Sequence, residues 1–265
     1  MELGHVPAAS MVGMIITLII SMVLPITLLI VAKVKYKAKI SSFFIGAGTF
    51  ILFALILEQI LHLIVIGAVG QDKLVSNIWL YGLYGAAAAA IFEETGRFVA
   101  FKFFMKNRRD RENAFMYGIG HGGIEAIIVV GITSINNIVN SVMINNGGIE
   151  AVLGLLPEEI KEQTFAQISQ LWTLPSYSFY MGGIERISAI ALHIGMTFVM
   201  YKGVKFAKKE MIALAYAIHF VADFATVILN NYLPMYALEA ILAVFAICIC
   251  ILAYKINAKE ETIEN

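Results

Sequence analysis

Residues 91–98 read IFEETGRF and place three charged side chains inside an apolar run that covers about residues 78–105. A run of this length can cross a bilayer, which takes about 20 apolar residues. Glu93, Glu94 and Arg97 would then lie at membrane depth, where each charge costs at least about 2.5–3.5 kcal/mol. We therefore expect these groups to face partners on other helices or a water-filled cavity.

The spacing within this stretch predicts which groups meet. On an α-helix Glu93 and Arg97 are four residues apart and share a face, whereas Glu94 points about 100° away. One interpretation is structural: an ion pair and a hydrogen bond between helices hold a bundle together. The other is functional, because ionisable residues inside a membrane mark functional sites by default. The functional interpretation depends on partners elsewhere in the chain.

The composition is typical of a polytopic membrane protein. Of 265 residues, 60% are hydrophobic and 14% are charged, whereas soluble domains carry about 25% charged residues. The 19 basic and 19 acidic residues cancel, and no basic tract suggests a nucleic-acid partner. Cys248 and Cys250 would point to different faces of one helix, so we expect neither a disulfide nor a metal pair. The N-terminus lacks the basic region of a cleaved signal peptide, so the first apolar segment is expected to remain as a span.

The apolar segments predict an all-α fold, a single transmembrane domain over residues 1–265 with about seven spans. Their approximate bounds are 11–32, 41–69, 78–105, 114–138, 181–202, 210–230 and 235–254. Basic residues follow the odd-numbered spans: Lys33, Lys35, Lys37, Lys39, Lys106, Arg108, Arg109, Arg111, Lys202, Lys205, Lys208, Lys209, Lys255 and Lys259. The opposite loops hold only Lys73 and Lys161. By the positive-inside rule, the N-terminus lies outside and the C-terminus lies in the cytoplasm.

One long loop, about residues 139–180, falls on the outer side. Within it, residues 157–172 begin with Pro157 and two acidic residues, which is typical of a helix start. An apolar face would be formed by Ile160, Ile168, Leu171 and Trp172. We expect this helix to lie on the membrane surface.

Histidines and carboxylates recur on the spans that follow Glu93. They are His121 and Glu125 on span four, His193 on span five, and His219 and Asp223 on span six. Four glycines between residues 118 and 123 surround His121, so another backbone or a substrate can come close. Counting from the span ends places Glu93 and the three histidines at similar depth, from the mid-bilayer toward the cytoplasmic half. The sequence thus predicts one polar layer built by four helices.

Two further groups of polar residues fit this layer less well. Span two carries Glu58 and His62, four residues apart but nearer the outer half, and we interpret them as structural or accessory. Arg186 lies two turns from His193 with Glu185 beside it, near the outer end of span five. The sequence assigns no role to this second pair.

A polar layer of this kind supports few reactions. A glutamate can act as general base on water, and Arg97 would keep one carboxylate ionised and oriented. Imidazoles can stabilise an oxyanion or hold Zn²⁺ together with a carboxylate. Hydrolysis inside the membrane fits all of these roles. A proton-coupled carrier would also place such groups at mid-membrane, but the chain shows no broken helices or two-fold repeat.

Four motifs, EETGR, GHGGIEAI, ERISAIALH and HFVAD, resemble in their order and separation the YhfC-type bacterial membrane proteins. These are grouped with the type II CAAX prenyl endopeptidases, the PrsW proteases and the anterior-pharynx-defective subunit of gamma-secretase. The resemblance covers most of the chain, from about span two to span six. It implies an all-helical intramembrane protease whose first-motif glutamate activates water, with histidines from later helices. The gamma-secretase subunit implies that the fold can also serve as a scaffold.

The resemblance assigns roles to individual positions. Glu93 matches the catalytic glutamate, Glu94 its partner, Arg97 the basic residue of that motif, His193 an isolated histidine, and His219 with Asp223 the closing HxxxN/D pair. Two departures separate this chain from both branches. The prenyl endopeptidases place their Arg one position later, and the spacing here is that of PrsW, which has Lys. The second motif of the prenyl endopeptidases is FxxxH, whereas in this chain Tyr117 occupies the position four residues before His121. Glu125 matches the position at which PrsW has a glutamate.

We therefore predict an intramembrane endopeptidase in a bacterial plasma membrane, acting on a membrane-associated peptide or a single-span protein. The alternatives are a non-catalytic scaffold or immunity-type protein and a proton-coupled carrier. The candidate catalytic residues are Glu93, Glu94, Arg97, His121, Glu125, His193, His219 and Asp223. A glutamate-activated water without a cofactor is the preferred mechanism, because HExxH is absent and each histidine comes from a separate helix. In the alternative, Zn²⁺ would take its ligands from His121, His193, His219 and Glu125.

Overall fold

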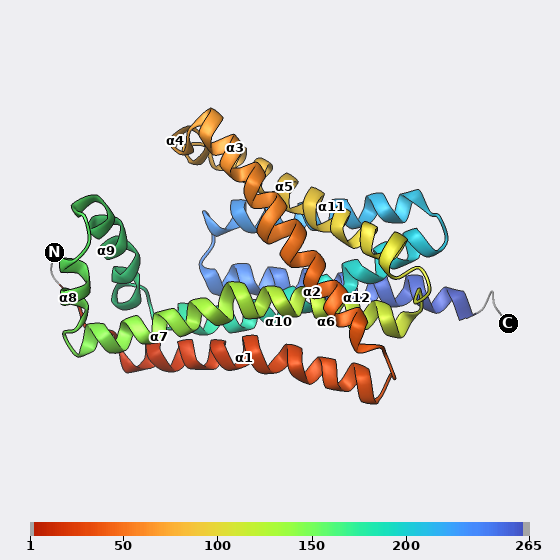
Figure 1. Cartoon of the computed structure of the whole chain (residues 1–265), viewed down its shortest axis with the longest axis horizontal. Coiled ribbons are helices and arrows are strands. Elements are labelled where there is room, and N and C mark those ends of the chain that lie inside the picture. Colours follow the sequence, from red (N-terminus) through yellow and green to blue (C-terminus); the bar gives the residue numbers. More distant parts are fainter. Residues whose placement is uncertain (1–2, 262–265) are drawn as a thin grey trace. The chain divides into compact units, whose positions relative to one another are not determined.

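The computed structural model describes residues 3–261, with side chains up to Asn257, so Lys259 lies outside the described side chains. Every regular element within residues 3–261 is a helix (Figure 1), which confirms the predicted all-α class. The α-helices are α1 (Ala8–Val34), α2 (Ile40–Phe50), α3 (Gln59–Val69), α4 (Gln71–Val75), α5 (Ile78–Val99), α6 (Arg111–Glu125), α7 (Ile132–Asn145), α8 (Ile149–Gly154), α9 (Glu158–Thr173), α10 (Tyr177–Lys205), α11 (Lys209–Asn230) and α12 (Met235–Glu261). Three π-helical segments interrupt or extend them: η1 (Ile51–Glu58), η2 (Ala100–Phe104) and η3 (Ala126–Gly131).

Six of the described helices are long and apolar enough to cross a membrane. They are Ala8–Val34, Ile40–Val69, Arg111–Asn145, Tyr177–Lys205, Lys209–Asn230 and Met235–Asn257. The predicted third span is also helical, as α5 followed by η2, but it is not among the six. The three charged residues of this helix lower its mean hydropathy, so it is not recognised as a membrane span by apolarity alone. The total of seven spans and the side on which each terminus lies stay predictions.

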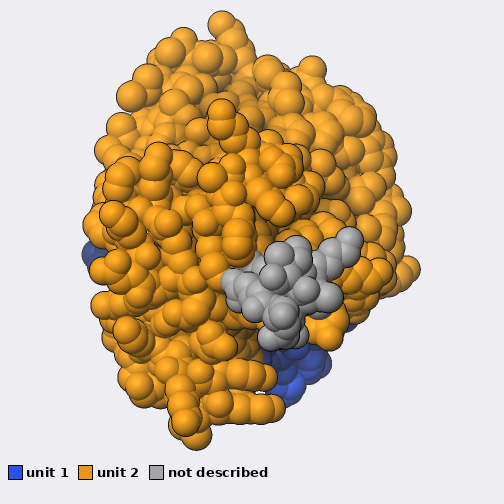
Figure 2. Space-filling view, turned by 90° about the vertical axis from the view of Figure 1, so that its right-hand side faces the viewer, with its two compact units in different colours: residues 1–24, 126–187 blue, residues 25–125, 188–265 orange. Residues whose placement is uncertain are grey.

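The chain divides into two compact units, each made from two separate segments (Figure 2). Unit 1 combines Met1–Leu24 with Ala126–Ile187, and unit 2 combines Pro25–Glu125 with Ser188–Asn265. All eight candidate catalytic residues belong to unit 2. The fold that positions the site is therefore that of unit 2.

Unit 1 contains the helix predicted in the long loop. This helix is α9, which follows Pro157 directly, and its Ile168 and Leu171 are buried against the start of α1 and the end of α7. Ile160 is half exposed, as a residue that faces a membrane can be, so the position of this helix on the membrane surface stays a prediction. The loop is also shorter than predicted, because α7 continues to Asn145. The helix continues beyond its apolar run through asparagine and serine residues, because backbone hydrogen bonds do not depend on side-chain hydropathy.

Glycines bring the helices of unit 2 into backbone contact, as predicted for the segment around His121. A Cβ atom on Gly120 would lie 2.1 Å from the carbonyl oxygen of Phe43 on α2. On the same helix, a Cβ atom on Gly122 would lie 3.0 Å from the Cβ of His193 on α10. Helix α6 is thus in close contact with α2 and with α10, and these contacts fix the position of His121 between the two helices.

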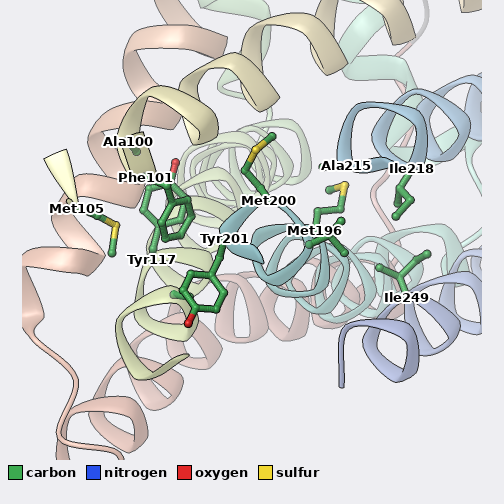
Figure 3. Close-up of a cluster of buried hydrophobic side chains, with 12 residues drawn as sticks. Ala100, Phe101, Met105, Tyr117, Met196, Met200, Tyr201, Ala215, Ile218 and Ile249 are labelled. Carbon is green, nitrogen blue, oxygen red and sulfur yellow. The ribbon is translucent and has the colours of Figure 1, made fainter. Parts of the chain in front are cut away.

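A buried apolar cluster joins η2, α6, α10, α11 and α12 (Figure 3). Phe101 and Tyr117 pack with ring centroids 5.0 Å apart, and Tyr201 lies 6.0 Å from Phe101. Helix α5 packs along α11 (Figure 1), so the two carboxylates and the arginine of α5 face a histidine-bearing helix. The packing therefore fixes the helices that carry the site.

Candidate metal centre and active site

The four helices predicted to build a polar layer do bring their polar side chains into contact. Helix α5 contributes Glu93, Glu94 and Arg97; α6 contributes His121 and Glu125; α10 contributes His193; α11 contributes His219 and Asp223. Glu94, Arg97 and His121 are fully buried, and Glu93, His193 and His219 are nearly so. Ionisable groups buried inside apolar membrane helices are candidates for a functional role.

Glu93 lies at the centre of this group, because its carboxylate reaches all three histidines. Its Oε2 is 2.8 Å from Nε2 of His121 and 4.0 Å from Nδ1 of His193. Its Oε1 is 3.9 Å from Nε2 of His219. The first glutamate of the EETGR motif is therefore the group that connects the other helices.

Arg97 pairs with Glu94, so the predicted pair of Glu93 and Arg97 is wrong. Nη1 of Arg97 donates to Oε1 of Glu94, three residues earlier on the same helix. Positions three and four residues apart both share a helix face. Spacing alone could not choose between the carboxylates, and the deciding factor is that His121 from α6 takes Glu93.

Arg97 also fixes the tautomer of His193. Nη2 of Arg97 lies 3.0 Å from Nδ1 of His193. A guanidinium can only donate, so Nδ1 accepts and a neutral ring carries its proton on Nε2. That nitrogen lies 2.6 Å from Oε2 of Glu125, close enough for an ion pair. His193 is thus held between a cation and an anion.

His219 is held by carboxylates at both ring nitrogens. Its Nδ1 lies 2.9 Å from Oε1 of Glu94, the oxygen that also accepts from Arg97. Its Nε2 lies 3.3 Å from Oδ2 of Asp223, four residues later on α11. Glu94 therefore joins Arg97 to His219, and the Nε2 side of the ring faces Glu93.

Asp223 is the accessible member of the group. Its side chain is 40% exposed, compared with 16% for Glu125 and 10% or less for the other six residues. Water or substrate would meet the cluster beside Asp223 first.

Glu58 lies closer to this cluster than the sequence analysis expected. It is buried, its Oε1 is 3.2 Å from Nε2 of His62, and Nδ1 of His62 is 2.7 Å from the hydroxyl of Tyr84. The charge of Glu58 is near enough to act on those of Glu93 and His219. Glu58 ends the π-helical segment η1, whose i→i+5 hydrogen bonds shift later residues around the helix. The sequence held one signal for this placement: Glu58 lies four residues before His62, and the acid and histidine of span six are also four residues apart.

Three side chains form a group that can hold a metal ion. Glu93, His121 and His193 each offer one ligand atom, these atoms lie within 4.8 Å of one another, and all three residues are buried. Within the described part of the chain, Nδ1 of His121 has no hydrogen-bond partner. Two imidazoles and a carboxylate are a donor set that zinc accepts, so these residues fit a metal site. The group differs from the predicted ligand set, since Glu93 belongs to it while His219 and Glu125 lie beside it.

The fold and this site together define a multi-pass membrane protein with a buried centre of carboxylates and histidines. A family model described as YhfC intramembrane metalloprotease matches residues 20–246, and the chain belongs to this family. A relative named "Uncharacterized membrane protein YhfC", from Bacillus subtilis (strain 168), is 40% identical over 188 residues, which cover 70% of this chain and 72% of the relative. No solved structure matches the chain.

Membership in this family confirms the YhfC-like resemblance and the location in a bacterial membrane. The family's description also indicates an intramembrane protease in general and a metal at its centre. It gives no support to the metal-free glutamic mechanism that the sequence analysis preferred. Grouping with the CAAX prenyl endopeptidases and PrsW stays a prediction.

Proposed function

We propose that this protein is an intramembrane endopeptidase in which Glu93, His121 and His193 hold a zinc ion. The observation that carries this proposal is the convergence of three buried ligand atoms from three helices, next to a fourth helix that offers His219. A buried hydrogen bond between membrane helices contributes only about 0.6 kcal/mol on average. A network of this size is therefore an inefficient way to stabilise a bundle, which favours a chemical role.

The chain's own residues would orient each ligand. The His121 ring packs against Phe50 at a centroid distance of 5.3 Å and against Tyr117 at 6.1 Å. Arg97 contacts Nδ1 of His193 and Glu125 contacts Nε2, so the two residues together would hold the orientation of this ring. When bound, zinc supplies Lewis acidity, which makes water a nucleophile near neutral pH.

Proton transfer would be carried by Glu93 and His219. Because Oε2 of Glu93 faces His121, its Oε1 is left to accept the proton of the attacking water. Nε2 of His219, 3.9 Å from that oxygen, would deliver a proton to the leaving nitrogen as the peptide bond breaks. Glu94 and Asp223 orient the His219 ring. Oε1 of Glu93 would then pass its proton to Nε2 of His219, so the proton taken from water replaces the one that His219 gave to the new amine.

The substrate class follows from where the site lies. Apolar helices surround it, and its accessible edge is at Asp223, so a peptide bond in a membrane-associated segment is the bond that can reach it. We propose a tailed peptide or a single-span protein as substrate.

The test compares bacterial membranes that contain the wild-type protein, Glu93→Gln, or Glu159→Gln, an exposed carboxylate on α9 that serves as control. New amino termini of membrane proteins are identified by mass spectrometry. Wild type and Glu159→Gln should generate the same new termini, and Glu93→Gln should generate none. Termini that persist in Glu93→Gln would overturn the assignment of Glu93, and a wild type that generates none would favour the scaffold alternative.

A further inference from the structure

A cavity away from the metal centre has the chemistry of a lipid-binding site. It lies between α6, α10 and α12 of unit 2 and has a volume of about 360 Å³. Among the residues that line it are Arg111, Ile194, Phe198, Ala253, Tyr254 and Asn257. A second cavity of about 290 Å³ shares Arg111 and Phe198 with it. Volumes of this size are typical of pockets that bind small ligands.

One end of the cavity is polar. Arg111 donates from Nη2 to the backbone carbonyl of Asn257, so the two residues are joined. Nδ2 of Asn257 donates to the carbonyl of Ala253 at 2.7 Å, which fixes the orientation of the amide. Its Oδ1 then has no hydrogen-bond partner in the described residues, although Asn257 is only 7% exposed. An unsatisfied buried acceptor is unfavourable, so it indicates a ligand that brings a donor.

The other end is apolar and belongs to membrane-spanning helices. Ile194 and Phe198 come from α10, and Ala253 comes from α12. Tyr254 is 73% exposed beside the cavity, where an aromatic ring suits the boundary between lipid and water. A ligand with an apolar chain and a polar head group fits this arrangement.

The charges around the polar end favour an anionic head group. Arg111 begins α6, directly after a loop that also holds Lys106, Arg108 and Arg109. Basic pockets between membrane helices bind anionic lipid head groups. Asp110 and Glu112 are opposing charges, but neither lines the larger cavity: Asp110 accepts hydrogen bonds from Asn113, and Glu112 is exposed and lines only the smaller cavity. The phosphate of a lipid therefore belongs at the Arg111 and Asn257 end of the larger cavity.

We propose that this cavity binds one anionic phospholipid with a hydroxylated head group, of the phosphatidylglycerol type. The phosphate accepts hydrogen bonds from Arg111, whose guanidinium has five N–H donors and so can serve more than one acceptor. A head-group hydroxyl donates to Oδ1 of Asn257. An acyl chain lies along Ile194, Phe198 and Ala253. This site does not depend on the proposed peptidase activity.

Native mass spectrometry of the detergent-solubilised full chain tests the proposal, with phosphatidylglycerol, phosphatidylcholine and glycerol phosphate as probes. Asn257→Asp keeps the shape of the side chain but places a negative charge near the phosphate. Arg111→Gln removes the cation, and Lys106→Gln is the control, because it removes a basic charge from the same loop outside the cavity. Thermal unfolding without lipid shows whether each variant is folded, and Asn257→Leu replaces Asn257→Asp if that variant is not.

Wild type and Lys106→Gln should each retain one phosphatidylglycerol in preference to phosphatidylcholine. Repulsion between the new carboxylate and the phosphate in Asn257→Asp, and loss of a charge-assisted hydrogen bond in Arg111→Gln, should each weaken that binding at least about tenfold. Glycerol phosphate alone should bind far more weakly, because it lacks the acyl chain. Equal binding of the two lipids by wild type would overturn the proposal. So would unchanged phosphatidylglycerol binding in the folded variants, or glycerol phosphate binding as tight as that of the lipid.

Discussion

Replacement of Arg97 by methionine tests the buried ion pair on which the site geometry depends. Arg97 and Glu94 are both 0% exposed, and Arg97 donates to Glu94 and lies against His193. Without the guanidinium, Glu94 keeps a buried charge and loses its permanent cation, with the ring of His219 as its remaining partner. Removing one member of a buried pair costs about 3–5 kcal/mol. Because about 1 kcal/mol shifts Tm by about 2–4 °C in a chain of roughly this size, Arg97→Met should lower Tm by about 6–20 °C.

Thermal unfolding of the purified protein in detergent measures this effect. The matched control is Lys161→Met, which breaks an exposed pair of the same spacing, with Nζ of Lys161 3.3 Å from Glu158. An exposed pair contributes about 0–1 kcal/mol, so the control should lower Tm by less than about 4 °C. The double variant Glu94→Gln, Arg97→Met removes both charges and should recover at least about half of the loss. Equal shifts for Arg97→Met and the control, or additive losses in the double variant, would refute the reasoning.

Three further predictions concern packing, electrostatics and topology. Gly120→Ala should lower Tm by several degrees, because overpacking costs about 1–3 kcal/mol and the new Cβ would lie 2.1 Å from a carbonyl oxygen of α2. Gly48→Ala is the control and should not lower Tm, because its new Cβ would meet no atom within 4 Å. Glu58→Gln should slow peptide cleavage by up to about tenfold with little change in Tm, since the charge of Glu58 stabilises a protonated His219 and a loss of about 1.4 kcal/mol is a tenfold change in rate. The buried Glu239→Gln should leave the rate unchanged. Cysteines placed in the loop 106–112 should react with membrane-impermeant reagents only from the cytoplasmic side, and labelling from outside would contradict the predicted orientation.

The sequence predicted the fold well because lipid and water impose different compositions on a chain. Apolar runs located the helices, but hydropathy could not locate their ends. The run at 114–138 is part of a continuous helix from Arg111 to Asn145, which includes a π-helical segment. The structure also divides the described chain into two compact units, which no composition shift in the sequence indicates.

The members of the candidate site were predictable, and their contacts were not. Charged residues and histidines stand out in apolar runs, so Glu93, His121 and His193 were found by position alone. Their partners depend on how side chains from different helices approach one another. Arg97 pairs with Glu94 because His121 from another helix contacts Glu93, and spacing within one helix could not predict this choice. Glu58 was interpreted as structural or accessory from its depth in span two, and the sequence gives no sign of the π-helical segment that ends at it.

The metal content of the purified protein is the measurement that tests the central claim most directly. Elemental mass spectrometry of protein prepared without chelators should find about one zinc ion per chain in wild type and in Glu239→Gln. His121→Ala and His193→Ala, each checked for folding by thermal unfolding, should lose that zinc, because zinc sites of this kind need three protein ligands. Peptide cleavage by wild type with no bound metal, or full zinc content in both folded histidine variants, would contradict the assignment of Glu93, His121 and His193 as the metal centre.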